Sequence, residues 1–156
     1  DSHQPATYEA AARIVSIVLG ELPDKHSLMA KKFHVNFIKY EKIKNKQKVS
    51  DFCLLNSLIY LNKHQVLAEV FLENGGGQLI LDAFRQSGSD TQVLYYVLLN
   101  VWLLSFVEVA LEKFIGVAKY GVLKSVCEVL QKLSREKLTR VAFLIFKNVE
   151  NNQNCL

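Results

Sequence analysis

The segment from Thr91 to Val107, TQVLYYVLLNVWLLSFV, contains 17 residues without a charged side chain and constrains the fold more than any other part of the chain. A related pattern, LTRVAFLIFKNV, begins at Leu138, 44 positions after Leu94. Self-similarity at such a period is typical of helical repeat proteins, in which each repeat packs against its neighbours. Paired positions of similar chemistry stand 44 apart: Gly77 and Gly121, Leu79 and Leu123, Leu94 and Leu138, Val97 and Val141, Trp102 and Phe146.

Composition also favours stacked helices. The chain of 156 residues is 50% hydrophobic, which is enough to bury a sizeable core. Only 2 prolines and 7 glycines interrupt it, so long helices fit better than the many tight turns of an all-β fold. We therefore expect an all-α solenoid of the armadillo or HEAT type, with about three to four repeats.

The repeat domain is expected to occupy residues 1–150, followed by a flexible polar tail over residues 151–156. The chain begins at Asp1 without an initiator methionine or a basic-then-apolar signal segment. We therefore interpret it as a segment of a longer protein.

Apolar periodicity places the individual helices. From Leu138 to Val149, apolar residues recur at i, i+3, i+4, i+7, i+8 and i+11, which lays one stripe along a helix. The segment 91–106 is apolar on nearly all sides, so we expect other helices to cover it and Trp102 to be buried between layers. Ser89, with Gln92 three residues on, predicts a capping box at its start. The expected helices span residues 5–19, 25–44, 48–62, 64–73, 77–87, 91–106, 108–117, 121–133 and 136–149.

The uncharged run over 91–107 also reaches the lower length limit of a transmembrane helix. Asn100 would need a hydrogen-bonding partner in lipid, and the flanking Asp90 and Glu108 are acidic where basic anchors are typical. A buried solenoid helix is the better interpretation.

No motif predicts catalysis, a cofactor or a metal site. Gly75, Gly76 and Gly77 lack the following Lys-Ser or Lys-Thr of a phosphate-binding loop, so a turn between helices explains them better. The 4 histidines form no HExxH pattern, and the 3 cysteines are too dispersed to complete a metal site. Cys127 lies among apolar residues and is interpreted as a small hydrophobic side chain. We expect a non-catalytic protein.

Basic charge is concentrated between residues 25 and 48. Eight lysines and one glutamate give this stretch a charge of +7, so the remainder carries +4 − 7 = −3. Three interpretations remain open: a solvated loop, docking to an acidic protein surface, and nucleic-acid binding. Lysine without arginine is a weak set for reading bases, which disfavours the third.

Four short motifs occur in the last three long helices predicted. They are Trp102-Leu103-Leu104-Ser105-Phe106, the run from Val122 to Leu130, Lys137-Leu138-Thr139-Arg140-Val141, and Phe146-Lys147-Asn148. In order and spacing they resemble the repeat region of the H subunit of the vacuolar-type proton-pumping ATPase (V-ATPase). The opening AAARIVSIVL is also similar, so the resemblance covers Ser2 to Glu150 and is strongest over 91–149. Gly121 stands where that family usually has proline.

The resemblance implies a non-catalytic subunit that binds the pump's peripheral stalk, regulates ATP hydrolysis, and couples the cytosolic ATPase sector to the membrane proton channel. It also implies other pump subunits as partners. The location would be the cytosolic face of vacuolar, lysosomal or endosomal membranes, reached through the complex without a transmembrane segment. No cofactor or direct nucleic-acid contact is expected from it. The alternatives are a generic armadillo-type adaptor in trafficking or nuclear import, and a lysine-patch nucleic-acid-binding module.

Two groups of residues follow from these patterns. The motif residues expected in the helical core are Trp102, Leu103, Leu104, Phe106, Leu138, Val141 and Phe146. The candidate partner surface consists of Lys42, Lys44, Lys46, Lys48, Lys137 and Arg140.

Overall fold

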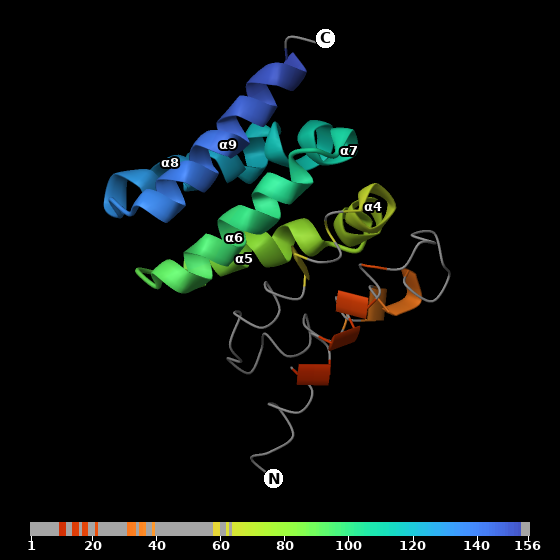
Figure 1. Ribbon diagram of the computed structural model, residues 1–156. Helices are drawn as coiled ribbons and strands as arrows, with labels where there is room; N and C mark the ends of the chain where they lie inside the picture. The colour runs from red at the N-terminus through yellow and green to blue at the C-terminus, as the bar shows by residue number, and fades with distance from the viewer. Residues whose placement is uncertain are drawn as a thin grey trace.

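The computed structural model describes residues 10–11, 14–15, 17–18, 21, 31–33, 35–36, 39, 58–59, 62 and 64–153. Over 64–153, every regular element is helical (Figure 1). The elements are α4 (Gln65–Glu73), α5 (Gly76–Ser87), α6 (Thr91–Leu104), α7 (Glu108–Ala110), the π-helical turn η2 (Leu111–Ile115), the 3-10 turn η3 (Ala118–Tyr120), α8 (Val122–Lys132) and α9 (Glu136–Gln153).

These helices stack as two successive copies of one unit. The first copy is α4, α5 and α6, and the second is α7 with η2, then α8 and α9. The long helices α6 and α9 pack against each other, and each also packs against the medium helix before it. Figure 1 shows α6 between α5 and α9. The prediction of an all-α helical-repeat fold is confirmed.

Helices α4, α5 and α8 begin and end within one residue of the predicted positions. The predicted helices 5–19, 25–44 and 48–62 lie in the part of the chain that is described only at scattered positions. Three other predicted ends are wrong. The helix expected over 91–106 stops at Leu104, because the backbone there tightens into bonds such as Phe106 N–H to Leu103 O at 3.3 Å.

The second wrong end concerns the helix expected over 108–117. Its α-helical part has only 3 residues, and the chain then widens into η2. The amide of Gly116 donates to the carbonyl of Leu111 at 2.9 Å, which is the five-residue spacing of a π-helix. A Cβ atom at Gly116 would lie 2.8 Å from that carbonyl oxygen, so the glycine allows the turn to close.

The third wrong end is that of the helix expected over 136–149, because α9 continues to Gln153, into the predicted tail over 151–156. The Asn152 side chain donates to the carbonyl of Asn148 at 2.8 Å, one turn earlier. Neither proline nor glycine interrupts residues 150–153, so nothing in the sequence stops the helix there. Residues 154–156 lie outside the described part of the chain.

Helix α6 starts at a cap that differs from the predicted one. Its N-cap is Asp90, whose carboxylate accepts hydrogen bonds from the amides of Gln92 at 3.0 Å and Val93 at 3.1 Å. The predicted Ser89–Gln92 capping box is therefore wrong. An aspartate in the N-cap position satisfies the same free amides and adds a favourable charge at the positive end of the helix.

The glycine-rich joint before α5 is a tight helix connection, as predicted. Gly75 adopts a left-handed conformation with φ of 82°, which glycine accepts without a steric penalty. Gly77 lies so close to the second copy that an added Cβ would be 2.9 Å from the ring of Phe114. The missing side chain thus permits close packing between the two copies.

The core follows the interface between the copies. Five apolar residues of α6 are almost fully buried: Leu94, Val97, Leu98, Val101 and Leu104. From the opposite side, α9 contributes Leu138, Val141, Ala142, Ile145 and Val149.

None of the helices in the described part is both long and apolar enough to cross a bilayer by itself; α6 and the stretch Glu108–Ile115 pass that test only as a pair bent by 117°.

Candidate functional site: the exposed surface of the repeats

The motif residues that carry the family resemblance occupy three different environments. Leu104, Leu138 and Val141 are buried, whereas Trp102, Leu103 and Phe146 are half-buried. Phe106 is 63% exposed, so its expected place in the core is wrong. The physical reason is that α6 ends two residues earlier, which removes Phe106 from the buried stripe of the helix.

Trp102 is less enclosed than its sequence pattern predicts. Its ring packs against the exposed ring of Phe106 in an edge-to-face arrangement, with centroids 5.4 Å apart and an interplanar angle of 71°. The indole Nε1 is buried and has no hydrogen-bond partner among the described residues. Trp102 therefore covers the edge of the core beside Phe106 and is only partly inside it.

Two side-chain hydrogen bonds join residues that lie far apart in the sequence. The amide of Asn62 donates to Asn100 Oδ1 at 3.1 Å, and both side chains are fully buried. The amide of Asn148 donates to Ser105 Oγ at 2.8 Å, which joins α9 to α6. Buried polar pairs of this kind favour one stacking register, because a displaced register would leave them unpaired. The sequence signal for this pairing was Asn100 inside an otherwise apolar run.

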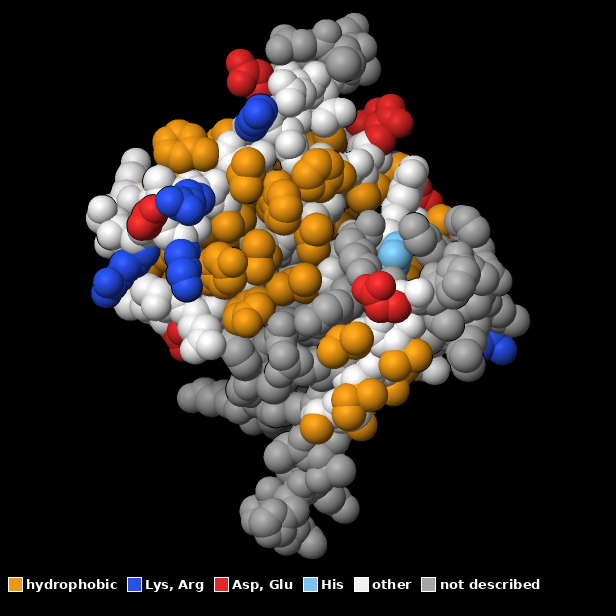
Figure 2. All heavy atoms as spheres, in the orientation of Figure 1, with side chains coloured by type: hydrophobic (Ala, Val, Ile, Leu, Met, Phe, Trp, Pro, Cys, Tyr) orange, Lys and Arg blue, Asp and Glu red, His pale blue; other side chains and the backbone are white. Residues whose placement is uncertain are grey.

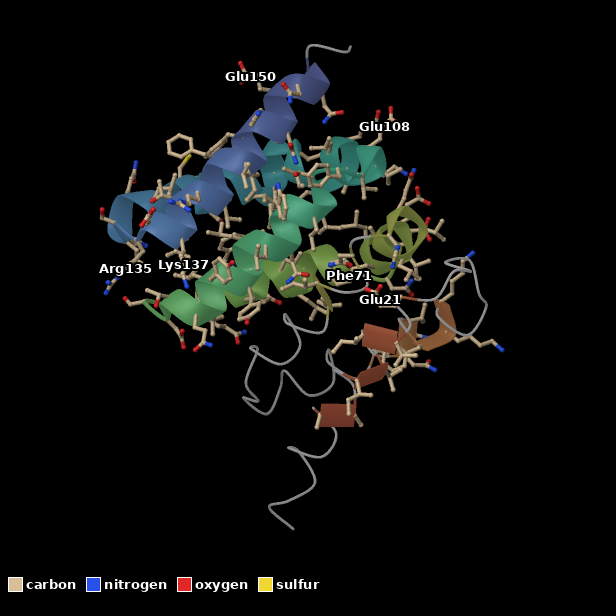
Figure 3. The ribbon with its side chains drawn as sticks, viewed as in Figure 1. Glu21, Phe71, Glu108, Arg135, Lys137 and Glu150 are labelled. Atoms are coloured by element: carbon tan, nitrogen blue, oxygen red, sulfur yellow. The ribbon has the colours of Figure 1, made fainter. Side chains whose placement is uncertain are left out.

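The candidate partner surface lies only partly in the described residues. Lys137 and Arg140 are both exposed near the start of α9. The guanidinium of Arg140 pairs with Glu136, one turn earlier, and both side chains are about three-quarters exposed (75% and 76%), so the pair contributes little to stability. Figure 3 shows Arg135 and Lys137 at one end of α9 and Glu150 towards the other end. Lys42, Lys44, Lys46 and Lys48 lie outside the described residues.

An open groove separates the starts of α6 and α9. Tyrosines line its α6 side, and charged side chains line its α9 side. Its lining residues are Thr91, Gln92, Tyr95, Tyr96, Arg135, Glu136, Lys137 and Leu138. This chemistry suits contact with a polar or charged surface of another macromolecule.

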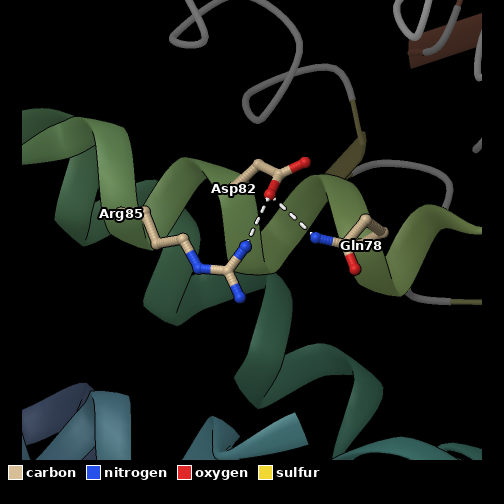
Figure 4. Close-up of polar contacts among 3 residues, drawn as sticks. All are labelled: Gln78, Asp82 and Arg85. Carbon is tan, nitrogen blue, oxygen red and sulfur yellow. Dashed lines mark hydrogen bonds and ion pairs between the residues drawn. The ribbon is translucent and has the colours of Figure 1, made fainter.

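A polar cluster on α5 belongs to that helix alone. Asp82 accepts hydrogen bonds from Gln78 Nε2 at 2.8 Å and Arg85 Nη1 at 3.1 Å (Figure 4). The three residues are spaced i, i+4 and i+7, which is the spacing of neighbours on a helix surface. The cluster supports α5 and does not bring together groups from different elements.

Cys127 is exposed on α8, so its interpretation as a small core hydrophobe is wrong. The buried stripe of α8 runs through Val122, Val126 and Val129, which places Cys127 one position beyond it. Over the described residues, no group of three or more His, Cys, Asp or Glu side chains has the arrangement of a metal site.

Stacked helical copies, buried inter-copy contacts and charged outer surfaces define a helical-repeat scaffold protein. The family model of the V-ATPase H subunit matches residues 2–156, so the chain belongs to the V-ATPase H-subunit family. Members of this family regulate the pump and are not its catalytic subunit. No curated protein and no solved structure matched the chain.

Proposed function

We propose that this chain is part of a connecting and regulatory subunit of the vacuolar proton-translocating ATPase. It binds the peripheral stalk and couples the cytosolic ATPase sector to the membrane proton channel. The observation that supports this role is the family match over residues 2–156. The fold agrees with it, because solenoids present long surfaces on which several partners bind at once.

The proposed partners are the peripheral stalk and the catalytic sector. The proposed location is the cytosolic face of vacuolar, lysosomal or endosomal membranes, where the chain is held by these subunits. Family membership supports both statements, since a pump subunit acts where the pump is assembled.

Co-purification tests the role directly. The tagged chain serves as bait in detergent extracts of vacuolar or lysosomal membranes, and we expect it to recover peripheral-stalk subunits. Recovery of trafficking or nuclear-import factors without any pump subunit would instead support a generic adaptor. Loss of the recovered partners on nuclease treatment would support the nucleic-acid-binding alternative.

The lysines at the end of the basic stretch are the first surface to test within this role. Glutamate replacements of Lys42, Lys44, Lys46 and Lys48 reverse four charges, and we expect weaker stalk binding at low salt. Binding through exposed charges should also weaken as salt rises, because screening acts beyond about 8 Å at physiological ionic strength. The matched control reverses the charge of four exposed lysines outside the basic stretch. They are Lys113, Lys119, Lys124 and Lys132. If both folded variants bind the stalk with equal affinity, the basic stretch is a solvated loop and not the stalk-binding surface.

A further inference from the structure

The outer face of α9 has a pattern of side chains that the stacking of the repeats does not explain. It consists of the exposed residues Lys137, Arg140, Phe143, Leu144 and Lys147, which we call the α9 stripe. Their spacing of 3, 3, 1 and 3 residues keeps them on one side of the helix. Phe143 is 63% exposed and Leu144 41% exposed. On the face that Figure 2 displays, apolar side chains lie beside basic ones.

The inner face of α9 already supplies its core contacts. Leu138, Ala142 and Ile145 are at most 1% exposed and pack against the rest of the core. Phe143 and Leu144 follow directly after Ala142, so they turn away from that interface. Two large apolar side chains exposed next to each other are a stronger sign of an interaction site than isolated ones.

Comparison with α6 shows that the stripe differs from an ordinary repeat contact. The positions 44 residues before Lys137, Arg140 and Lys147 are apolar or aromatic, half-buried side chains. These counterparts are Val93, Tyr96 and Leu103. Three cations thus replace three partly covered side chains of the preceding copy, whereas Phe143 retains the apolar character of its counterpart Leu99. A face that another helical layer covers in the same way would not carry three cations, because burying unpaired charge is costly.

The charges define the chemistry of the partner. Within the described residues, Lys137 and Lys147 form no ion pair, and Arg140 pairs only with the exposed Glu136. Cations therefore lie on both sides of the apolar pair. Ten residues separate the two lysines, which corresponds to about 15 Å along the axis, or about three helical turns. A complementary surface has apolar side chains in the middle, with carboxylates about two turns away on the Lys137 side and about one turn away on the Lys147 side.

We propose that the α9 stripe binds an acidic amphipathic helix of a partner chain. Leucine-like side chains of that helix cover Phe143 and Leu144, and its carboxylates pair with Lys137 and Lys147. This is the helix-on-helix form of peptide recognition, in which spaced apolar anchors give affinity and flanking charges give specificity. A membrane surface fits less well, because Glu136 and Glu150 are exposed on the same helix and would be repelled by anionic lipid.

A designed peptide tests this proposal. The probe is a fluorescein-labelled, alanine-based helical peptide with two adjacent leucines and with glutamates about two turns to one side of them and one turn to the other. We expect saturable binding to the whole chain by fluorescence anisotropy. A peptide of the same composition in scrambled order should bind at least tenfold more weakly. Equal binding of the two peptides would contradict the proposal, because it would show attraction by net charge alone.

Variants of the chain separate the apolar and the charged contributions. Phe143→Ala with Leu144→Ala should weaken binding at least tenfold. Lys137→Glu with Lys147→Glu should also weaken it, and a peptide with lysines in place of its glutamates should then restore binding. The matched control, Lys113→Glu with Lys119→Glu, should retain the original affinity. Circular dichroism confirms that each variant is folded, and the charge-reversal pair decides the result if the apolar variant is unfolded.

Two further outcomes would overturn the proposal. One is loss of peptide binding in the Lys113 and Lys119 control to the same extent as in the stripe variants. The other is Phe143-dependent capture by vesicles of phosphatidylcholine and phosphatidylserine without peptide binding, which would identify a membrane surface. Both results are independent of stalk binding, which co-purification measures separately.

Discussion

The contact between Ser105 and Asn148 gives the sharpest test of how the two copies stack. Ser105 Oγ donates to the carbonyl of Trp102 at 2.6 Å and accepts from Asn148 Nδ2 at 2.8 Å. The two residues are 43 positions apart, and Ser105 is fully buried. This bond exists only while α6 and α9 lie in their native register, so its free energy reports on that register.

A double-mutant cycle measures the bond. Ser105→Ala removes the acceptor, Asn148→Ala removes the donor, and the double variant removes both. A hydrogen bond between neutral groups stabilises a folded protein by about 0.5–1.5 kcal/mol net. We therefore expect each single variant to be destabilised and the double variant to be about 1 kcal/mol more stable than the sum of the two losses.

Urea titration of the four proteins, followed by circular dichroism, gives the coupling energy. In a chain of this size, 1 kcal/mol corresponds to a shift in Tm of roughly 2–4 °C, so thermal melts provide a second reading. The control pairs Ser105→Ala with Thr139→Ala, since the Thr139 hydroxyl donates to Arg135 O at the start of α9 and, among the described residues, makes no bond to α6. Losses in that control should simply add. A coupling near zero between Ser105 and Asn148 would refute the stacking of α6 against α9 through this contact.

The remaining predictions concern packing, exposure and nucleotide binding. Gly77→Ala should destabilise the chain by roughly 1–3 kcal/mol in urea titration, because its Cβ would lie 2.9 Å from the ring of Phe114; an unchanged midpoint would contradict the close approach. Trp102→Ala should cost less than the roughly 3–5 kcal/mol of a fully buried tryptophan, because Trp102 is half-buried; a larger loss would indicate full burial. Cys127 should react with Ellman's reagent in the native protein, because it is exposed; protection until unfolding would place it in the core. Calorimetry should detect no saturable ATP binding, because no phosphate-binding loop is present in the sequence.

The helices were predictable from the sequence where the apolar period was strong. Along α9, the stripe from Leu138 to Val149 indicated both the helix and its buried side. Along α6, the nearly continuous apolar run indicated coverage by other helices, and most of its residues are buried or half-buried. These predictions succeeded because burial of an apolar stripe is a property of the helix itself, whichever helix covers it.

Helix ends and individual exposures were less predictable. Ser89 and Asp90 are both good N-cap residues, and only the backbone decides which of them accepts from the first amides. Phe106 continues the apolar period in sequence, but the helix ends before it. Cys127 has apolar neighbours in sequence, but the buried stripe of α8 runs through Val122, Val126 and Val129 and leaves Cys127 exposed. In each case, a shift of one or two residues, in the end of a helix or in the position relative to its buried stripe, changes the environment of the side chain.

The partner surfaces were less predictable still, because repetition and recognition use different residues. Core positions such as Val97 and Val141 recur because each copy buries the same stripe against its neighbours. This recurrence identifies the fold and the family, but it does not say where a partner binds. We expect partner specificity to depend on positions at which the copies differ, such as Tyr96 and its exposed counterpart Arg140. In a repeat protein, a charged residue that replaces a partly covered apolar one in the next copy is therefore a useful sign of a binding surface.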